Sequence, residues 1–389
     1  MTHRYADLCR SAAAALDAVP ATAQPQAMVG FDGFVDHIID VVAKRESRTS
    51  YTSTPTIADL GAKITAAAGK SANFELVTRH SKIGGNGPIM ANALCSHGCK
   101  VTAVGILGDK VIDSVFAPLA ERAERVISLG APAVTDALEF SDGKLMFGKL
   151  FPLEAVTYKR LLEAVGGVAG LKDLLRTPRG IATVNWTMTL ELTTIWEHLA
   201  AEILPGLRAD RPLWFIDLAD PAKRTTTDIL AAMAALGKLQ AFADVVLGLN
   251  EAECSQICEV LGLVWPTAAT EWEAAEQACV QIRDRLKLSY VMCHLVRSSA
   301  VAWNVARNVT RATGAAHGSA SADGFWVAKP KITTGAGDHF NAGFLTGLMH
   351  GIAPAQCLQI GGATSGHYVR TAESPTRAQA ANFLRDAAG

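Results

Sequence analysis

The sequence is poor in cysteine, and the few cysteines form no recognisable disulfide or metal pattern. Its 389 residues include 8 cysteines, too few for a fold held together by disulfides. Cys95 and Cys99 are four residues apart, as are Cys254 and Cys258, and no histidine pair follows at zinc-finger spacing. We therefore expect reduced thiols in the core of a cytoplasmic protein.

Net charge and long apolar runs are also lacking, which excludes two classes of partner. Lys and Arg number 36 against 37 Asp and Glu, so no overall basic field would attract nucleic acid. No apolar run approaches the roughly 18 residues of a membrane span. The alanine-rich N-terminus is interrupted by Asp17, which favours an amphipathic helix over a signal peptide. We expect neither a nucleic-acid nor a membrane partner, although a few backbone amides could still bind a small anion.

The chain does have a regular alternation of apolar, β-branched runs with helical patterns. Because 49% of the residues are hydrophobic and 19% are charged, we expect a globular protein with a large core. Strands are expected at 27–31, 100–106, 181–184, 213–216, 245–247 and 290–293, and helices at 87–97, 190–203, 226–236, 251–261, 271–286 and 338–349. This order predicts a single α/β domain over residues 1–389, with mostly parallel strands and helices on both faces.

Two stretches interrupt the alternation. Residues 42–72 are polar and rich in Ser and Thr, and residues 137–150 contain two short apolar runs around Ser141-Asp142-Gly143. Asp-Gly between apolar runs is typical of a β-hairpin. Such a hairpin could be an ordinary surface feature or a small lid over a cleft, and any lid elements should lie within these two stretches.

The strongest local signal lies at 333–343, which reads TTGAGDHFNAG. Small residues let backbone N–H groups converge on a ligand, and the helix that follows would offer its N-terminus to an anion. Asp338 stands at this helix start. Its carboxylate could simply cap the helix, or it could face the anion and act as a general base.

Two more stretches combine polar side chains with glycine near a predicted strand end. Gly84, Gly85 and Asn86 precede the helix expected at 87–97, and Asn86 could bind a hydroxyl-rich ligand. The alternative is a helix cap with a tight turn. Asp32 and Asp36 follow the first strand, where open α/β sheets bind ligands, although each could also lie in a solvated loop.

Two further motifs follow later strands. Asn250 and Glu253 lie on one helical face, where their oxygens could hold the water shell of Mg²⁺, or they could form a capping box. Arg224 closes the motif D-x-x-D-P-x-x-R after the strand at 213–216. It could clamp a phosphate, with a solvent-facing basic residue as the alternative.

Taken in their order along the chain, these motifs resemble those of the ribokinase-like (PfkB) carbohydrate kinase family. The resemblance covers the chain from about Phe31 to Leu384. It rests on an acid after the first strand, the GGNG loop, a hairpin, N-x-x-E and G-A-G-D-x-F-x-A-G-F, in this order. The resemblance implies a three-layer αβα sandwich with a mostly parallel central sheet and a small β lid. It also implies a cytoplasmic kinase that phosphorylates a small sugar with ATP and Mg²⁺. A homodimer would be compatible with this family.

The resemblance assigns roles by motif position. Asp338 corresponds to the catalytic base. The anion hole is assigned to Gly335, Ala336 and Gly337. Phosphate binding is assigned to Thr334, Arg224, Asn250 and Glu253, and Asn250 and Glu253 would also hold Mg²⁺ through water. Substrate binding is assigned to Asp32, Asp36, Gly84, Gly85 and Asn86. Residues 362–375 lie where relatives border the adenine. Trp186 either stacks on the sugar or belongs to the core.

Three departures leave alternatives open. Ile332 replaces the Asp that helps relatives bind a monovalent cation, residues 293–299 lack the usual glycine-containing nucleotide loop, and the insertion at 42–72 is long. An ADP-dependent sugar kinase and a nucleoside kinase are the alternative enzymes. A non-catalytic sugar- or nucleotide-binding protein on the same fold is the alternative from another class. Neither the acceptor nor the oligomeric state can be read from the motifs.

Overall fold

The computed structural model describes residues 3–305 and 316–389. Within them, a 9-stranded sheet forms the centre of the molecule. Its spatial order is β14 (His317–Asp323), β13 (Ser298–Asn304), β12 (Tyr290–His294), β11 (Asp244–Asn250), β10 (Leu213–Asp217), β9 (Gly180–Thr183), β1 (Gln26–Gly30), β5 (Lys100–Gly105) and β6 (Arg125–Ser128). All neighbours from β12 to β6 pair in parallel, and β13 and β14 add an antiparallel edge.

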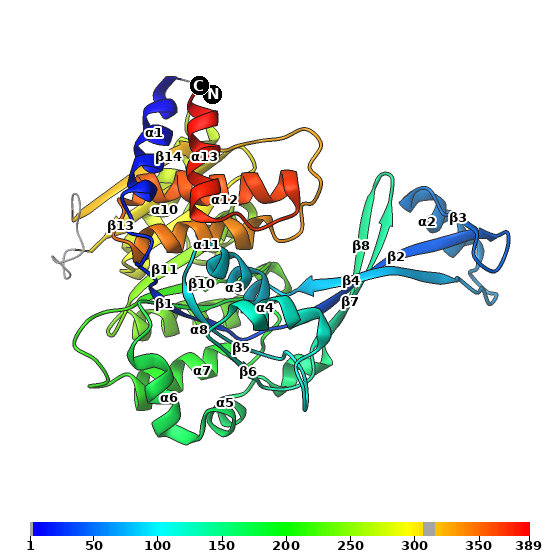
Figure 1. Cartoon of the computed structure of the whole chain (residues 1–389), viewed down its shortest axis with the longest axis horizontal. Helices are drawn as coiled ribbons and strands as arrows, with labels where there is room; N and C mark the ends of the chain where they lie inside the picture. Colours follow the sequence, from blue (N-terminus) through cyan, green and yellow to red (C-terminus); the bar gives the residue numbers. More distant parts are fainter. Residues whose placement is uncertain (1–2, 306–315) are drawn as a thin grey trace.

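Helices cover both faces of this sheet, as Figure 1 shows. They are α1 (His3–Asp17), α3 (Asn86–Ser96), α4 (Ala117–Arg122), α5 (Tyr158–Val165), α6 (Gly167–Arg176), α7 (Leu192–His198), α8 (Thr226–Leu239), α9 (Glu251–Val260), α10 (Glu271–Leu286), α11 (Ala336–Met349), α12 (Pro354–Thr371) and α13 (Arg377–Ala388). A further helix, α2 (Ile57–Ala66), lies instead beside the smaller sheet described below. No helix of the described part of the chain is long and apolar enough to cross a membrane.

The core divides into two layers because strand side chains alternate between the faces of the sheet. Trp214 and Ile216 of β10 pack with residues of α7, α8, α9 and α10. Leu213 and Phe215 of the same strand pack on the other face with α1, α3, α11, α12 and α13. The three-layer αβα sandwich with a mostly parallel sheet is therefore confirmed.

A second, smaller sheet extends from the body (Figure 1). Its strands are β3 (Tyr51–Ser53), β2 (Phe34–Arg45), β7 (Ala133–Phe140) and β8 (Gly143–Lys149), and β4 (Leu76–Gly84) pairs with β2. Strands β7 and β8 form the hairpin that Asp142-Gly143 predicts. The small sheet has its own core, made by Ile39, Val41, Leu60 and Leu138.

The small sheet is larger than the sequence suggested. The segment after the first strand is a 12-residue strand rather than a loop, so Asp36 lies on β2. All the expected strands and helices of the body are present. One helix differs, because α7 ends at His198 and continues as a π-helix over Leu199–Ile203.

Candidate active site

Polar side chains gather where the parallel strands of the central sheet end. They are Asp32 after β1, Asn185 after β9, Asp217 at the end of β10, Asn250 at the end of β11 and His294 at the end of β12. Asn250 and His294 are register partners and therefore neighbours. The carboxyl ends of parallel strands are where open α/β sheets bind ligands.

The loop at 333–338 faces this row of strand ends. Gly335 occupies the cap position of α11 with a φ of 90°, a conformation that favours glycine, and makes no side-chain cap bond. Asp338 in the first helical turn is buried, and its Oδ1 accepts a hydrogen bond from Asn86 Nδ2 at 2.9 Å. The carboxylate is therefore not the helix cap.

The pKa of Asp338 is set chiefly by its burial. Burial raises the pKa of Asp338 to about 8, and the charge of nearby Asp32 adds to the rise. The hydrogen bond from Asn86 opposes it. A carboxyl group with a pKa near neutrality can take a proton from a bound hydroxyl and release it again.

Asp32 holds the loop that carries Asn86. Its two oxygens accept hydrogen bonds from Asn86 N at 2.9 Å, Gly87 N at 2.7 Å and Asn185 Nδ2 at 2.7 Å. Burial raises the pKa of this carboxyl to about 6. The buried carboxylate therefore holds the Gly85-Asn86 loop in place. A direct contact of Asp32 with substrate stays a prediction.

Asp36 lies on the small sheet next to the loop that carries Gly84 and Asn86. It is buried on β2, opposite Lys82 of β4. A Cβ atom on Gly84 would lie 2.2 Å from Asp36 Oδ1, so any side chain at this position would displace the carboxylate. Burial raises the pKa of Asp36, and Lys82, Thr135 and Lys144 oppose the rise. A carboxylate flanked by two lysines can accept hydrogen bonds from sugar hydroxyls.

Lys144 links the small sheet to the loop at the start of α11. It follows the turn of the β7–β8 hairpin, and its Nζ donates a hydrogen bond to Thr334 Oγ1. Sequence reasoning missed this residue, although it predicted the hairpin that carries it and the threonine that it contacts. The contact places a positive charge beside the glycine-rich loop.

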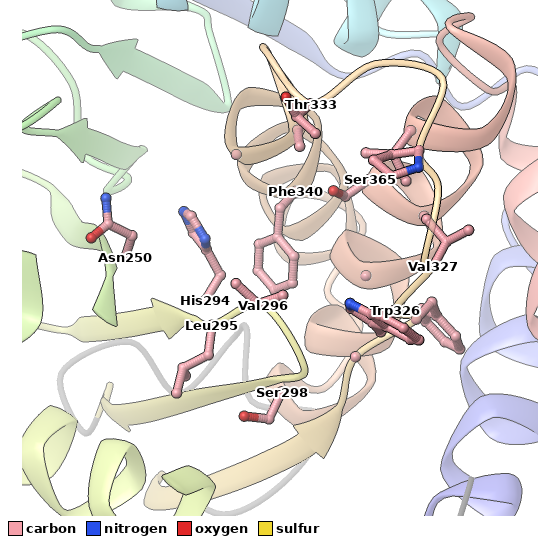
Figure 2. Close-up of a pocket in the computed structure, with 18 of the residues that line it drawn as sticks. Asn250, His294, Leu295, Val296, Ser298, Trp326, Val327, Thr333, Phe340 and Ser365 are labelled. Carbon is pink, nitrogen blue, oxygen red and sulfur yellow. The ribbon is translucent and has the colours of Figure 1, made fainter. Parts of the chain in front are cut away.

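Asn250 and Glu253 form the capping box that their spacing allows. Asn250 Oδ1 accepts from Glu253 N at 3.0 Å, and Glu253 Oε2 accepts from Asn250 N at 2.9 Å. Glu253 Oε1 accepts from Asp220 N at 2.9 Å. The cap does not remove Asn250 from the site, because its side chain still lines the adjoining cavity (Figure 2).

This cavity opens beside the glycine-rich loop. It has a volume of about 690 Å³, within the range of small-molecule sites. Its lining includes Asn250, His294, Phe325, Gly337, Phe340 and Gly362. In Figure 2 the His294 ring points into the space between Asn250 and Phe340. Burial lowers the pKa of His294 to about 4, so the ring is neutral near pH 7.

The site also has the oxygen ligands that a divalent cation prefers. Asp217 Oδ2 accepts from Asn341 Nδ2 at 2.9 Å. The other side-chain oxygens, Asp217 Oδ1 and Asn341 Oδ1, are buried without a hydrogen-bond partner among the described residues. Burial and the charges of Glu253 and Asp338 raise the pKa of Asp217 well above its usual value.

These carboxylates are not arranged as a direct metal cage. Across residues 3–305 and 316–389, no group of three or more His, Cys, Asp or Glu side chains is placed to hold a metal ion. The donor set fits Mg²⁺ bound largely through water and phosphate oxygens, the mode that this ion commonly adopts.

Two predicted site residues contact each other, and one of them, Trp186, belongs to the core. Trp186 is fully buried, and its indole Nε1 donates to Thr193 Oγ1 at 2.8 Å. The Arg224 guanidinium lies over the Trp186 ring, 4.5 Å from its centroid, and donates to Thr187 O at 3.3 Å and Asp228 Oδ2 at 3.4 Å. The Trp186 ring is therefore enclosed by protein groups, whereas phosphate binding by the half-buried Arg224 stays a prediction.

The core position of Trp186 makes a prediction. We expect Trp186→Phe to lower the free energy of unfolding by about 2 kcal/mol, because it leaves a cavity and removes the bond to Thr193. The KM for a sugar should stay within about twofold, because the ring is fully buried among protein groups. Chemical denaturation and steady-state kinetics measure the two effects. A raised sugar KM with unchanged stability would contradict the core assignment.

Comparisons with known proteins agree with this geometry. A family model described as "Prokaryotic ketohexokinase" matches residues 6–387. A ketohexokinase from Haloferax volcanii is 28% identical over 392 residues, which cover 98% of this chain and 96% of that protein.

Solved structures show the same fold at lower identity. A carbohydrate kinase from Agrobacterium tumefaciens has a TM-score of 0.58 at 15% identity and covers 93% of this chain and 97% of its own. Arabidopsis thaliana ribokinase, solved with ribose and ATP, has a TM-score of 0.55 at 16% identity, and the match covers 94% of this chain and 99% of the ribokinase chain. The resemblance drawn from the order of the motifs is therefore confirmed.

Proposed function

This chain belongs to the prokaryotic ketohexokinase family and is a carbohydrate kinase, and we propose that it transfers the γ-phosphoryl group of ATP to a hydroxyl group of a ketohexose. The name of the Haloferax volcanii relative supports the acceptor class. The observation that carries the proposal is Asp338, a buried carboxyl with a pKa raised to about 8, hydrogen-bonded to Asn86 beside the glycine-rich loop.

In the proposed reaction, Asp338 accepts the proton of the acceptor hydroxyl as the hydroxyl oxygen attacks the γ-phosphorus. One oxygen–phosphorus bond forms, and the bond from the γ-phosphorus to the bridging oxygen of ADP breaks. The proton remains on Asp338 until the phosphorylated sugar leaves. Asn86 orients the carboxylate, and Asp32 orients Asn86 through its main-chain amide.

Charge on the transferring phosphoryl group would be stabilised by the loop at 333–337. Ala336 contributes less than its motif position suggests, because its amide donates to Thr333 O at 3.2 Å. The amides of Gly335 and Gly337 have no main-chain acceptor within the described residues. We assign these two amides as hydrogen-bond donors to the phosphoryl group. Lys144, which donates to Thr334 Oγ1 in the same loop, would add a positive charge.

The donor nucleotide would occupy the cavity of about 690 Å³ that lies between the glycine-rich loop and His294. Bound Mg²⁺ would offset the negative charge of the donor phosphates. The side-chain oxygens of Asn250, Glu253 and Asp217 would hold this ion, chiefly through water. Asp36, with Asn86, would bind the hydroxyls of the acceptor.

A coupled phosphoryl-transfer assay tests the proposal. The panel contains ketohexoses, aldohexoses, ribose and adenosine, with ATP or ADP as donor and Mg²⁺ present. We expect kcat/KM to be highest for a ketohexose with ATP, by at least about 100-fold over adenosine, since a site built for one set of hydroxyls rejects others strongly. Preference for ADP or for adenosine would support the alternative kinases instead. Tight sugar binding without transfer to any acceptor would support a binding protein.

A further inference from the structure

Two aromatic rings pack together behind the glycine-rich loop. His339 follows Asp338 on α11, and Tyr368 lies on α12. Their ring centroids are 3.6 Å apart with planes 13° from parallel, so the rings stack. Both side chains are buried, with exposures of 2% and 8%. The proposed reaction uses neither residue.

Each ring binds one carbonyl oxygen of the loop. The Tyr368 hydroxyl donates to Thr334 O at 3.0 Å. His339 Nδ1 lies 2.7 Å from Gly335 O, and since a carbonyl can only accept, Nδ1 carries the proton. Burial lowers the pKa of His339 to about 4, so its Nε2 is unprotonated and accepts from Ser374 Oγ at 2.8 Å.

The second ring nitrogen ties His339 to a further element. Ser374 Oγ also receives a hydrogen bond from Asn92 Nδ2 of α3, at 3.2 Å. The imidazole is therefore fixed at both nitrogens and on one face. A side chain held in this way has little freedom to move. Its hydrogen bond therefore also limits the motion of the Gly335 carbonyl group.

The carbonyl oxygens matter because of the planarity of the peptide bond. In a trans peptide the C=O and the N–H of the next residue point in opposite directions. Holding Thr334 O therefore fixes the direction of the Gly335 N–H, away from Tyr368. Gly335 has a φ of 90° and no Cβ, so its backbone would otherwise rotate easily.

We propose that Tyr368 and His339 are positioning residues for phosphoryl transfer, which hold the Thr334–Gly335 peptides so that the Gly335 amide is oriented before charge develops on the phosphoryl group. The inference rests on the proposed kinase reaction. Backbone amides that are oriented in advance stabilise the charge of the transition state more than that of the bound substrates. Loss of the restraint should therefore lower kcat and leave the KM values for sugar and ATP nearly unchanged.

Tyr368→Phe tests the proposal by removing one oxygen atom while keeping the stacked ring. We expect kcat to fall about 10-fold, less than for loss of an anion-hole donor itself, and both KM values to stay within about twofold. Tyr158→Phe is the matched control, because that hydroxyl binds Glu202 on the surface at 2.9 Å. A kcat within about twofold of wild type, or a raised KM with unchanged kcat, would overturn the proposal.

Position 339 offers a rescue experiment. In His339→Asn the amide nitrogen can replace Nδ1 as donor to Gly335 O, whereas in His339→Leu nothing can. We expect the Asn variant to retain several times the kcat of the Leu variant at similar thermal stability. Equal kcat values in the two variants would count against a role for the Nδ1 bond.

Amide hydrogen exchange gives a readout that does not depend on activity. Residues 333–340 should exchange at least about 10-fold faster in Tyr368→Phe than in wild type, because a restraint on the loop is lost. If the wild-type protein transfers phosphate to no acceptor, the proposed function fails and exchange alone decides the present inference. Unchanged exchange in this segment would then overturn it.

Discussion

Asp338→Asn is expected to lower kcat by about 1,000-fold and to leave the KM values for sugar and ATP within about threefold. The asparagine keeps the shape of the side chain, and its Oδ1 can still accept the hydrogen bond from Asn86. It cannot take a proton from the acceptor hydroxyl. Since the change removes only the proton acceptor, the loss should fall on the chemical step and not on binding.

Steady-state kinetics over a range of both substrates measure this effect. Asp40→Asn is a suitable control, because Asp40 lies on the same strand as Asp36 but pairs with Arg79 at 3.2 Å in the small sheet. That variant should keep wild-type kcat. If Asp338→Asn retained turnover within about 10-fold of wild type, a base role for Asp338 would be untenable.

The raised pKa of Asp338 provides a second readout of the same assignment. With a pKa of about 8, the carboxyl is mostly protonated at neutral pH in the free enzyme. A base acts only when unprotonated, so kcat/KM for the sugar should rise between about pH 6 and 9, with its midpoint near pH 8, and level off above. The residual activity of Asp338→Asn should lack this rise. A wild-type profile that is flat over the same range would argue against Asp338 as the titrating base.

The fold of the body was largely predictable from the sequence because each strand is a short apolar run set between helical patterns. The run Val245–Leu249 is a clear example, since buried parallel strands are apolar on both faces. The small sheet was predicted less well. Strand β2 carries Asp36 and Asp40 among apolar residues, and from the sequence we expect such acids at the end of the first strand or in a solvated loop, not within a second strand.

The candidate site was predictable where a motif supplies the residue and its neighbour together. Asp338 and Asn86 are 252 residues apart, and only the order of their motifs suggested that they meet. Trp186 and Arg224 show the limit of that reasoning. A residue type that suits a ligand also suits a partner in the core, and here the two side chains are engaged with each other and with the neighbouring backbone.

Residues that act through the fold left no signal in the sequence. His339 stands at the position that the motif G-A-G-D-x-F leaves open, and Tyr368 lies in an ordinary helical segment. Only the packing of α12 against α11 brings the tyrosine hydroxyl to Thr334 O. Lys144 likewise depends on how the small sheet sits over the loop.

Lys144→Met is expected to lower kcat by about 100-fold, because the side chain supplies the positive charge nearest to the loop that would bind the phosphoryl group. Methionine keeps most of the volume and removes the charge together with the bond to Thr334 Oγ1. The effect should appear mainly in kcat, since charge on the phosphoryl oxygens changes during transfer. Lys144→Arg keeps the charge in a planar, bulkier group and should recover only part of the loss.

Lys149→Met is the matched control, because Lys149 lies on the same strand but an odd number of residues away, so that it points to the opposite face. There it pairs with Asp136 at 2.7 Å, mostly exposed to solvent. Its kcat should equal that of wild type. If Lys144→Met and Lys149→Met gave the same kcat, the charge of Lys144 would have no part in phosphoryl transfer. If only Lys144→Met were slow, and Lys144→Arg faster, the hairpin would carry a group that takes part in phosphoryl transfer.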